Sequence, residues 1–186
     1  RRMKRDNLPW RPVQSATLRW SETGVPTSNA FDDVYYSADN GLEESCHVFL
    51  SGNDLPRRWQ GFGGQHFCIA ELGFGTGLNF LLTWQAWRAA PAPRPDLHFL
   101  SIEKHPLARA DLARALAGWP TLAPLAERLL AAYPGLLPGQ HRLLLEDGVR
   151  LDLWWEDAAD TLADLAGHEQ PLVDAWYLDG FAPARN

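Results

Sequence analysis

One short stretch near the middle of the chain, residues 68–80, constrains the fold more than any other. It reads Cys-Ile-Ala-Glu-Leu-Gly-Phe-Gly-Thr-Gly-Leu-Asn-Phe, an apolar run with an acidic residue near its end, then three alternating glycines and a second apolar run. Glycine tolerates positive φ angles and lets two backbones approach closely, so this pattern predicts a buried strand, a tight turn and the start of a helix. A glycine turn between strand and helix is where doubly wound α/β proteins bind nucleotide-like cofactors.

The spacing of the glycines indicates which class of cofactor the turn binds. The motif is E-x-G-x-G-x-G, and Leu78 stands where the third glycine of a dinucleotide site would be. Glu71 would repel a pyrophosphate but suits a cofactor with positive charge, such as S-adenosylmethionine with its ammonium and sulfonium groups. We therefore predict a methyltransferase rather than a dehydrogenase. The residues of this segment predicted to contact the cofactor are Glu71, Gly73, Gly75, Thr76, Gly77 and Asn79.

A second apolar run, Leu97–Glu103, also ends in a carboxylate. In a doubly wound sheet, the acid at the end of the next strand binds ribose hydroxyls, so Glu103 is predicted to bind the cofactor, together with the adjacent Lys104. The alternative is that Glu103 is merely the first solvated residue after a strand.

Two further strand ends carry candidate site residues. Asp157 follows the strand predicted over 150–155 and is positioned to accept a hydrogen bond from an adenine amino group; it equally suits the N-cap of a helix starting at Ala158. Asp179 follows the strand predicted over 173–178, where a carboxylate can hold or deprotonate an attacking amine. Phe181 would form an apolar wall beside it. The alternative is an Asp-Gly turn with no chemical role.

Strands and helices alternate from residue 66 onward, which predicts a parallel sheet. The predicted helices cover 77–90, 106–118, 122–132 and 158–166, and a hairpin joins 141–146 to 150–155. We assign residues 66–186 to a Rossmann-like, S-adenosylmethionine-binding domain of class α/β. Short strands over 16–20, 33–37 and 46–50, with a hairpin tip at 39–41, predict a β-rich extension over residues 1–65. The chain stops soon after its fourth parallel strand, so we expect the doubly wound sheet to be truncated at its C-terminal strands.

The bulk properties fit one ordinary globular chain. It has 186 residues and a formal net charge of −6, so no overall basic field attracts nucleic acid. The two cysteines, Cys46 and Cys68, have neither metal-site nor disulfide-framework spacing, and the N-terminus is not a signal peptide, so we expect a cytoplasmic protein without a metal. No segment is long and apolar enough to span a membrane. Most of the nine tryptophans, Trp84 and Trp87 among them, are expected in the core.

With these residues in view, the chain resembles the methyltransferase domain of the MnmC family of bacterial tRNA-modifying enzymes. The resemblance covers nearly all of the chain from about residue 18. The segments that carry it are Phe31–Ser37, Asn40–Glu44, Val48–Leu50 with Gly52-Asn53, Gly73–Phe80, Trp84–Ala86, Asp174–Trp176 and Leu178–Ala184.

The resemblance implies a substrate and partners. It implies methylation of the aminomethyl nitrogen of a modified wobble uridine in the anticodon of tRNA, giving the methylaminomethyl form. Family members often carry a C-terminal oxidoreductase domain that binds FAD, which this chain does not contain. Candidate basic contacts to tRNA are Arg57, Arg58 and Arg185, which we expect beside loops at the cofactor face. The family usually has glycine where Glu156 stands, so this side chain would crowd the adenine or point to solvent.

Two other hypotheses of function remain. One is a degenerate methyltransferase fold that acts as a binding module, and the other is a nucleotide-dependent oxidoreductase. The intact acidic residues and glycines of the motif argue against the first, and Glu71 and Leu78 argue against the second.

Overall fold

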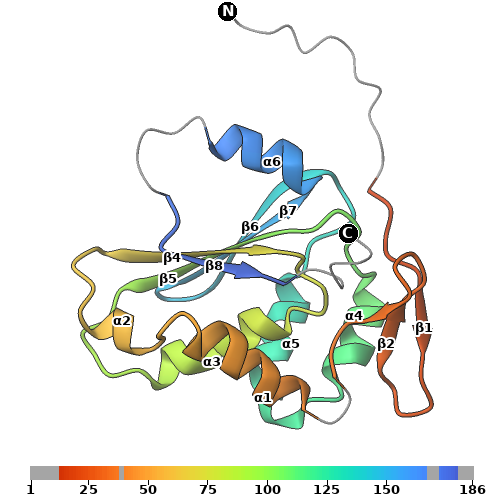
Figure 1. Cartoon of the computed structure of the whole chain (residues 1–186), viewed down its shortest axis with the longest axis horizontal. Helices are drawn as coiled ribbons and strands as arrows, with labels where there is room; N and C mark the ends of the chain where they lie inside the picture. Colours follow the sequence, from red (N-terminus) through yellow and green to blue (C-terminus); the bar gives the residue numbers. More distant parts are fainter. Residues whose placement is uncertain (1–12, 38–39, 167–171, 180–186) are drawn as a thin grey trace, which may run out of the picture.

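The computed structural model describes residues 13–37, 40–166 and 172–179. Its centre is a five-stranded sheet in the order β6-β7-β5-β4-β8 (Figure 1). The strands β4 (His66–Leu72), β5 (Asp96–Ile102), β7 (Val149–Trp155) and β8 (Ala175–Leu178) run parallel, while β6 (Gly139–Glu146) pairs antiparallel with β7. The predicted α/β class, parallel sheet and hairpin are confirmed. The described part of the chain is therefore built on one mostly parallel sheet whose strand ends share an edge.

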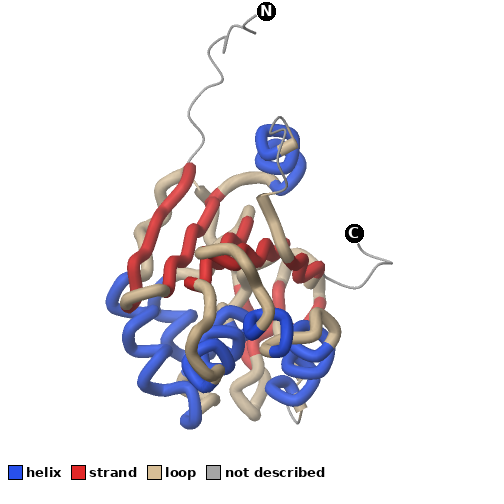
Figure 2. The backbone as a smooth tube through the Cα atoms, turned by 90° about the vertical axis from the view of Figure 1, so that its left-hand side faces the viewer, coloured by secondary structure: helices blue, strands red, loops and turns tan. Residues whose placement is uncertain are grey.

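Helices cover the two faces of this sheet unequally (Figures 1 and 2). One face carries α3 (Leu78–Ala89), α4 (Arg109–Leu116), α5 (Ala123–Ala132) after the 3₁₀ turn η2 (Pro120–Leu122), and the short helices α1 (Gly41–Ser45) and α2 (Arg57–Gln60). Among the described residues, the opposite face carries α6 (Ala158–Leu165). The main hydrophobic core therefore lies between the sheet and the first set of helices.

Helix α3 lies at the centre of that core. Trp84 and Trp87 are 0% and 6% exposed, which confirms their predicted core role. The indole of Trp84 donates to Glu146 Oε1 at 2.7 Å and that of Trp87 donates to Pro95 O at 2.8 Å, so their polar atoms are satisfied. The helix ends at Ala89 before the prolines of residues 91–95, because proline lacks the backbone donor that would continue it. Residues 78–84, which form its first two turns, are all buried, so this end of the helix is held against the sheet.

The N-terminal region combines strands and helices, and part of its prediction is wrong. A small antiparallel sheet contains β1 (Leu18–Trp20), the unpredicted β2 (Pro26–Ser28) and the short β3 (Asp33–Val34). The segment predicted as a strand over 46–50 is instead the π-helix η1 (Cys46–Ser51). Its residues have strand propensity, but tertiary packing overrides propensity here: Phe49 is buried against Tyr177, with ring centroids 5.0 Å apart.

The predicted hairpin tip at 39–41 is also wrong where it can be assessed. Asn40 stands at the N-cap of α1 and Gly41 is its first residue, while Asp39 lies outside the described residues. Phe49 of η1, Trp59 of α2 and Leu55 from the turn between them join the same core as the sheet. The division into an extension and a cofactor domain at residue 65 stays a prediction.

Candidate functional site

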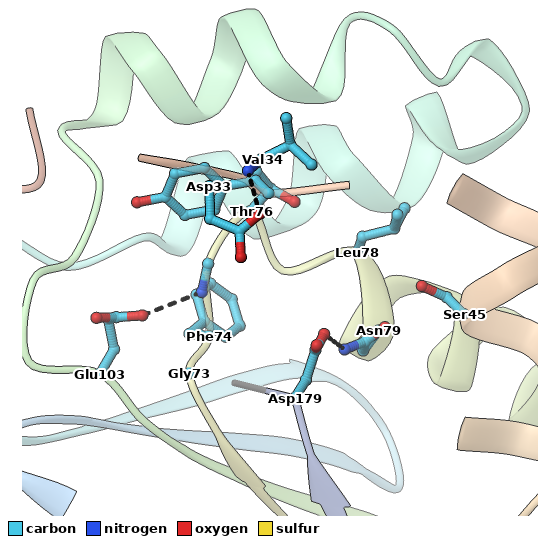
Figure 3. Close-up of a pocket in the computed structure, with 12 residues that line it drawn as sticks. Asp33, Val34, Ser45, Gly73, Phe74, Thr76, Leu78, Asn79, Glu103 and Asp179 are labelled. Carbon is cyan, nitrogen blue, oxygen red and sulfur yellow. Dashed lines mark hydrogen bonds between the residues drawn. The ribbon is translucent and has the colours of Figure 1, made fainter. Parts of the chain in front are cut away.

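A cavity opens where the carboxyl ends of β4, β5 and β8 meet (Figure 3). This is the edge at which open α/β sheets bind ligands. Six of the residues predicted from the sequence line it: Gly73, Gly75, Thr76, Asn79, Glu103 and Asp179. The structure thus brings together residues from three strand ends and the first turn of α3.

The glycine turn adopts the backbone conformation that its sequence predicts. Gly73, Gly75 and Gly77 have φ angles of +89°, +53° and +72°, a region that L side chains rarely adopt. A Cβ atom on Gly73 would also lie 2.9 Å from the backbone oxygen of Asp179. At Gly73 and Gly75 the turn therefore presents backbone to the cavity, while Phe74 and Thr76 also line it. Gly77, the N-cap of α3, does not line it.

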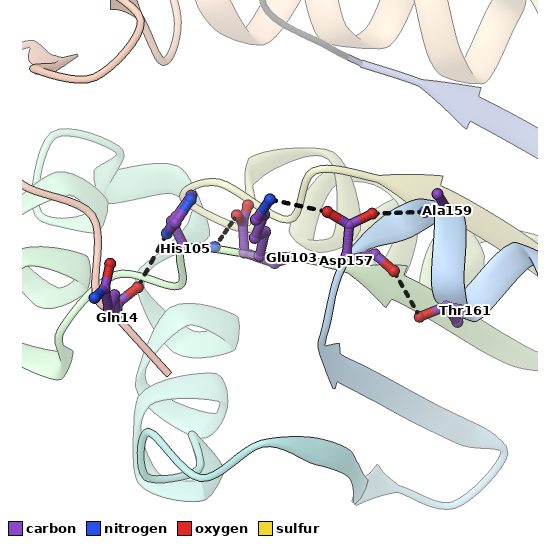
Figure 4. Close-up of polar contacts among 7 residues, drawn as sticks. Gln14, Glu103, His105, Asp157, Ala159 and Thr161 are labelled. Carbon is purple, nitrogen blue, oxygen red and sulfur yellow. Dashed lines mark hydrogen bonds and ion pairs between the residues drawn. The ribbon is translucent and has the colours of Figure 1, made fainter. Parts of the chain in front are cut away.

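Glu103 holds the turn from the neighbouring strand end. Its Oε2 accepts a hydrogen bond from the amide of Gly75 at 3.2 Å, and its Oε1 accepts one from the amide of His105 at 2.8 Å (Figures 3 and 4). Each carboxylate oxygen can accept more than one hydrogen bond, so the side chain retains capacity for a diol. The placement at the cavity wall fits the ribose role predicted for Glu103.

Asp179 lies on the other side of the cavity, at the end of β8. Its Oδ2 accepts a hydrogen bond of 2.7 Å from Asn79 Nδ2 (Figure 3). The surrounding protein raises the pKa of the Asp179 carboxyl by displacing water, the hydrogen bond from Asn79 opposes this, and the charge of Glu44 adds to the rise. Asp179 is therefore an oriented carboxylate with an increased affinity for a proton.

Glu71 is placed differently from the sequence-based expectation. Its side chain is 0% exposed and does not line the cavity. It accepts hydrogen bonds from Ser101 Oγ at 2.6 Å and from Asn79 Nδ2 at 3.0 Å. Burial raises the pKa of Glu71 to about 8, against these two hydrogen bonds, and the charges of Asp179 and Glu103 contribute to the rise. This acid lies behind the cavity wall.

The raised pKa of Glu71 predicts a pH-dependent stability. The folded state binds the carboxyl proton of Glu71 more tightly than the unfolded chain does. The stability that this proton adds to the folded state is therefore present at low pH and is lost as pH rises toward about 8. Glu71→Gln removes this proton. Between roughly pH 5.5 and 8.5, we expect the free energy of unfolding of the unmodified protein to fall by about 3 kcal/mol relative to the variant.

Urea denaturation at several pH values measures this difference. Glu127→Gln, which changes an exposed acid on α5, is the matched control and is expected to follow the unmodified protein. A constant difference between the Glu71 variant and the unmodified protein across this range contradicts the raised pKa.

Lys104 and Asp157 lie together but outside this cavity. Lys104 Nζ is 2.9 Å from Asp157 Oδ2, and Asp157 Oδ1 accepts the amide of Ala159 at 2.9 Å (Figure 4). Asp157 therefore caps α6, one of its two predicted roles. The hydrogen bond from Lys104 lowers the pKa of Asp157, with the amide of Ala159 adding to it. Glu156 accepts a hydrogen bond from Thr161 Oγ1 at 3.3 Å, so its carboxylate turns toward α6.

Three hollows follow one another along this edge of the sheet. The cavity beside Asp179 shares Tyr35 and Glu103 with a second hollow. The second hollow shares Gln14 and His105 with a third, which Lys104 and Asp157 line. The shared residues make the three hollows neighbours along this edge.

Sequence reasoning missed the residues that close the cavity from the N-terminal region. Asp33, Val34 and Tyr35 lie across the glycine turn, and Ser45 lines the cavity from the end of α1 (Figure 3). A Cβ atom on Gly75 would be 3.2 Å from Tyr35 Cδ1. The available signal was that residues 31–37 carry part of the family resemblance.

Of the predicted basic contacts, Arg57 and Arg58 do not lie at this edge. Arg58 donates to the backbone oxygen of Asp174, just before the amino end of β8, and its guanidinium lies 5.0 Å from the Phe67 ring centroid. Arg57 pairs with Asp54 on the same segment. The expectation that these arginines flank the cavity is wrong, because α2 leads into the opposite end of β4. Phe181 and Arg185 lie outside the described residues.

The described part of the chain also limits other kinds of site. Within it, no three His, Cys, Asp or Glu side chains come together in a way that could hold a metal ion. Cys46 and Cys68 are free thiols, and burial raises the pKa of Cys68 to about 12. None of the helices in the described ranges is long and apolar enough to cross a membrane.

The charges of the cavity decide which cofactor it suits. Three carboxylates line it, those of Asp33, Glu103 and Asp179, and Lys or Arg side chains are not among the described residues that line it. A pyrophosphate would meet repulsion from these acids, whereas an ammonium and a sulfonium would be attracted. The acidic lining of the cavity therefore fits S-adenosylmethionine better than a dinucleotide.

Comparisons with known proteins agree with this chemistry. Residues 120–186 match the model of a family described as S-adenosyl-L-methionine-dependent methyltransferase. A protein of Aliivibrio fischeri named "tRNA 5-methylaminomethyl-2-thiouridine biosynthesis bifunctional protein MnmC" is 49% identical over 96% of this chain. A protein of the same name from Vibrio campbellii is 51% identical over 94% of it. The chain spans 27% of the length of each of these relatives.

A solved structure supports the fold. The crystal structure of MNMC2 from Aquifex aeolicus matches with a TM-score of 0.65 and 19% sequence identity, over 93% of this chain and 52% of that one. At this identity the likeness supports the Rossmann-like α/β fold and not the residue roles. Sequence identity near one half along almost the whole chain shows that it is homologous to part of the MnmC proteins.

Proposed function

We propose that this chain binds S-adenosylmethionine at the glycine turn and directs methyl transfer to the aminomethyl nitrogen of a modified wobble uridine in tRNA. The observation that carries the proposal is the acidic cavity at the strand ends, with a glycine turn as its floor and an oriented carboxylate at one side. The names of the relatives, which concern tRNA 5-methylaminomethyl-2-thiouridine biosynthesis, suggest the substrate.

The cofactor would lie along the three connected hollows. Gly73, Gly75 and Thr76 would receive its methionine part, Glu103 its ribose hydroxyls and Asp157 its adenine. Lys104 is 61% exposed in its side chain, so it can leave Asp157 Oδ2 when the adenine amino group arrives. Gly77 would act by setting the start of α3 rather than by touching the cofactor.

Asp179 would orient the attacking amine. S-adenosylmethionine supplies a methyl group on a cationic sulfur; the amine lone pair forms the new C–N bond, the C–S electrons stay on sulfur, and the nitrogen then releases a proton. A primary amine attacks only when it is neutral, so a nearby carboxylate that accepts an N–H hydrogen bond or the proton assists the step. The raised pKa of Asp179 favours that role.

The larger setting of the reaction is part of the proposal. The relatives are called bifunctional and are several times longer than this chain, which is consistent with a fused oxidoreductase domain that binds FAD. Two free cysteines suit a reducing compartment, so we place the reaction in the cytoplasm. tRNA would approach the mouth of the cavity beside Asp179.

The two alternatives make different predictions. A dinucleotide-dependent oxidoreductase would bind NAD at the glycine turn, which the acidic lining disfavours. A degenerate binding module would retain the fold without transferring a methyl group.

A transfer assay tests the proposal. The protein is incubated with S-adenosylmethionine labelled in its methyl group and with tRNA that carries the aminomethyl form of the uridine. We expect label in the methylaminomethyl nucleoside after digestion of the tRNA. tRNA that already carries the methylated form is the control and should take up no label. Saturable cofactor binding without any transfer would support the binding module instead.

The adenine contact at Asp157 makes a separate prediction. Asp157→Asn keeps a good N-cap for α6. It replaces the other carboxylate oxygen by an NH₂ group, which cannot accept a hydrogen bond from the adenine amino group. We expect the dissociation constant for S-adenosylmethionine to rise roughly tenfold, with the thermal midpoint nearly unchanged. Calorimetric titration and a melting curve measure the two quantities. Unchanged affinity would remove Asp157 from the adenine site and leave it as a cap.

A further inference from the structure

Glu71 is a buried acid that the proposed reaction does not yet use. It is the last residue but one of β4, where its register neighbours are Ser101 on β5 and Tyr177 on β8. Its carboxyl is fully covered, and its contacts with Ser101 and Asn79 run inside the protein rather than into the cavity. A buried carboxyl that touches neither solvent nor the cavity can affect the reaction only through its hydrogen-bonded neighbours or through its charge.

Asn79 connects this acid to the cavity. Its Nδ2 donates to Glu71 Oε1 at 3.0 Å and also to Asp179 Oδ2 at 2.7 Å. An amide nitrogen carries two N–H donors, so each carboxyl can take one. In the flipped orientation, the amide oxygen would face both carboxyls, and an ionised Asp179 would lose the donor that the amide nitrogen now supplies. Acceptors on two sides therefore fix how the Asn79 amide is turned.

We propose that Glu71 is a positioning residue for methyl transfer, which fixes the amide of Asn79 and thereby holds Asp179 with its second oxygen, Oδ1, toward the substrate amine. The inference rests on the proposed function and assigns Glu71 a role other than the cofactor contact predicted from the motif. No part of it requires Glu71 to touch either substrate.

The titratable groups around Glu71 make its connection through Asn79 to Asp179 dependent on pH. Asp179 at the end of β8 and Glu103 at the end of β5 raise the pKa of Glu71 by their charges, and Tyr177 on β8 lies beside it in the sheet. Ser101 and Asn79 donate hydrogen bonds from β5 and α3. Near a pH of about 8, Glu71 changes charge while Asn79 still bridges it to Asp179. The rate of methyl transfer should therefore change with pH around the pKa of Glu71.

Two substitutions separate positioning from cofactor contact. Glu71→Leu removes the acceptor, whereas Glu71→Gln keeps an oxygen for Asn79 and lets the Ser101 hydroxyl accept instead of donate. We expect Glu71→Leu to lower the single-turnover rate at saturating S-adenosylmethionine by about tenfold or more, with its dissociation constant within about threefold of normal. Glu71→Gln should recover most of the rate at neutral pH and lack the change in rate near pH 8. Glu127→Gln is the control for a charge change elsewhere.

A second readout needs no substrate. The side-chain NH₂ signals of Asn79 in a nitrogen-15 NMR spectrum should titrate with a midpoint near a pH of about 8 in the unmodified protein, and this titration should vanish in Glu71→Gln. The measurement remains informative if Glu71→Leu fails to fold.

The outcomes distinguish this inference from the proposed function. A large loss of cofactor affinity in Glu71→Gln, with a normal single-turnover rate, would show that Glu71 contacts the cofactor and would overturn the positioning role. Identical pH profiles and identical Asn79 titrations in the unmodified protein and Glu71→Gln would overturn it as well. Failure of the unmodified protein to bind S-adenosylmethionine would instead overturn the proposed function, while the NMR titration would still test the link between Glu71 and Asn79.

Discussion

Replacing Asp179 by Asn is expected to reduce the rate of methyl transfer by about 10²-fold or more, the usual size of a lost acid–base contribution. The variant keeps an oxygen that can accept the hydrogen bond from Asn79, which now measures 2.7 Å. It loses the negative charge that would attract the amine and the capacity to take its proton. The dissociation constant for S-adenosylmethionine should stay within about threefold, because neutralising one of the three acids removes only part of the attraction for the cofactor.

Asp174→Asn is the matched control for this experiment. Asp174 precedes the same strand at its other end, where its Oδ2 accepts the amide of Cys68 at 2.8 Å. It is an acid just before β8 that does not line the cavity, so its substitution should leave transfer unchanged in a folded protein. Single-turnover kinetics with labelled cofactor measure both variants. Full activity of Asp179→Asn would exclude this carboxylate from the mechanism.

The second large effect is expected from Gly75→Val. A side chain at this position would project toward Tyr35, whose Cδ1 is 3.2 Å from the position of a Cβ atom, and would enter the space proposed for the cofactor. Gly75 also has a φ of +53°, which a β-branched residue adopts only with strain. We expect the affinity for S-adenosylmethionine to fall by about 10²-fold or more, equivalent to roughly 3 kcal/mol.

Gly24→Val separates strain from occlusion of the cavity. Gly24 has a φ of +81° and nothing within 4 Å of its would-be Cβ atom, so this substitution imposes backbone strain without filling a cavity. Both variants should lose stability in a melting experiment, whereas the large fall in cofactor affinity should occur in Gly75→Val alone. Normal binding by a folded Gly75→Val would remove the glycine turn from the cofactor site.

Local sequence patterns predicted the sheet and the turn well for physical reasons. Apolar runs such as Phe67–Leu72 and Leu97–Ile102 are buried on both faces of a parallel sheet, so each reads as a nearly continuous hydrophobic segment. The positive φ angles of the turn require glycine, and the required residues are visible in the sequence. The six predicted residues that meet in the cavity follow from these two facts and from the rule that strand ends share one edge.

The motif alone could not reveal the direction of the Glu71 side chain. The sequence places an acid near the end of a strand, but burial and the donors Ser101 and Asn79 determine where the carboxyl lies. These donors come from a neighbouring strand and from the following helix. The pairing of Lys104 with Asp157 likewise depends on two strand ends that are far apart in the chain.

Local sequence patterns also could not predict which residues close the cavity from the N-terminal region. Tyr35 and Asp33 belong to a region with short, irregular strands, and their position over the turn depends on contacts with the main domain. One such contact is the hydrogen bond from Tyr36 to the backbone oxygen of Ala115, and another joins Ala16 to Pro106. The helix at 46–51 was missed because the burial of Phe49 against Tyr177, and not the propensity of the segment, sets its conformation.

Calorimetric titration of the protein with S-adenosylmethionine, and separately with NAD, tests the central claim most directly. The acidic cavity and the glycine turn predict saturable binding of S-adenosylmethionine and none of NAD. Binding of NAD alone would contradict the account, and so would binding of neither ligand by a protein shown to be folded.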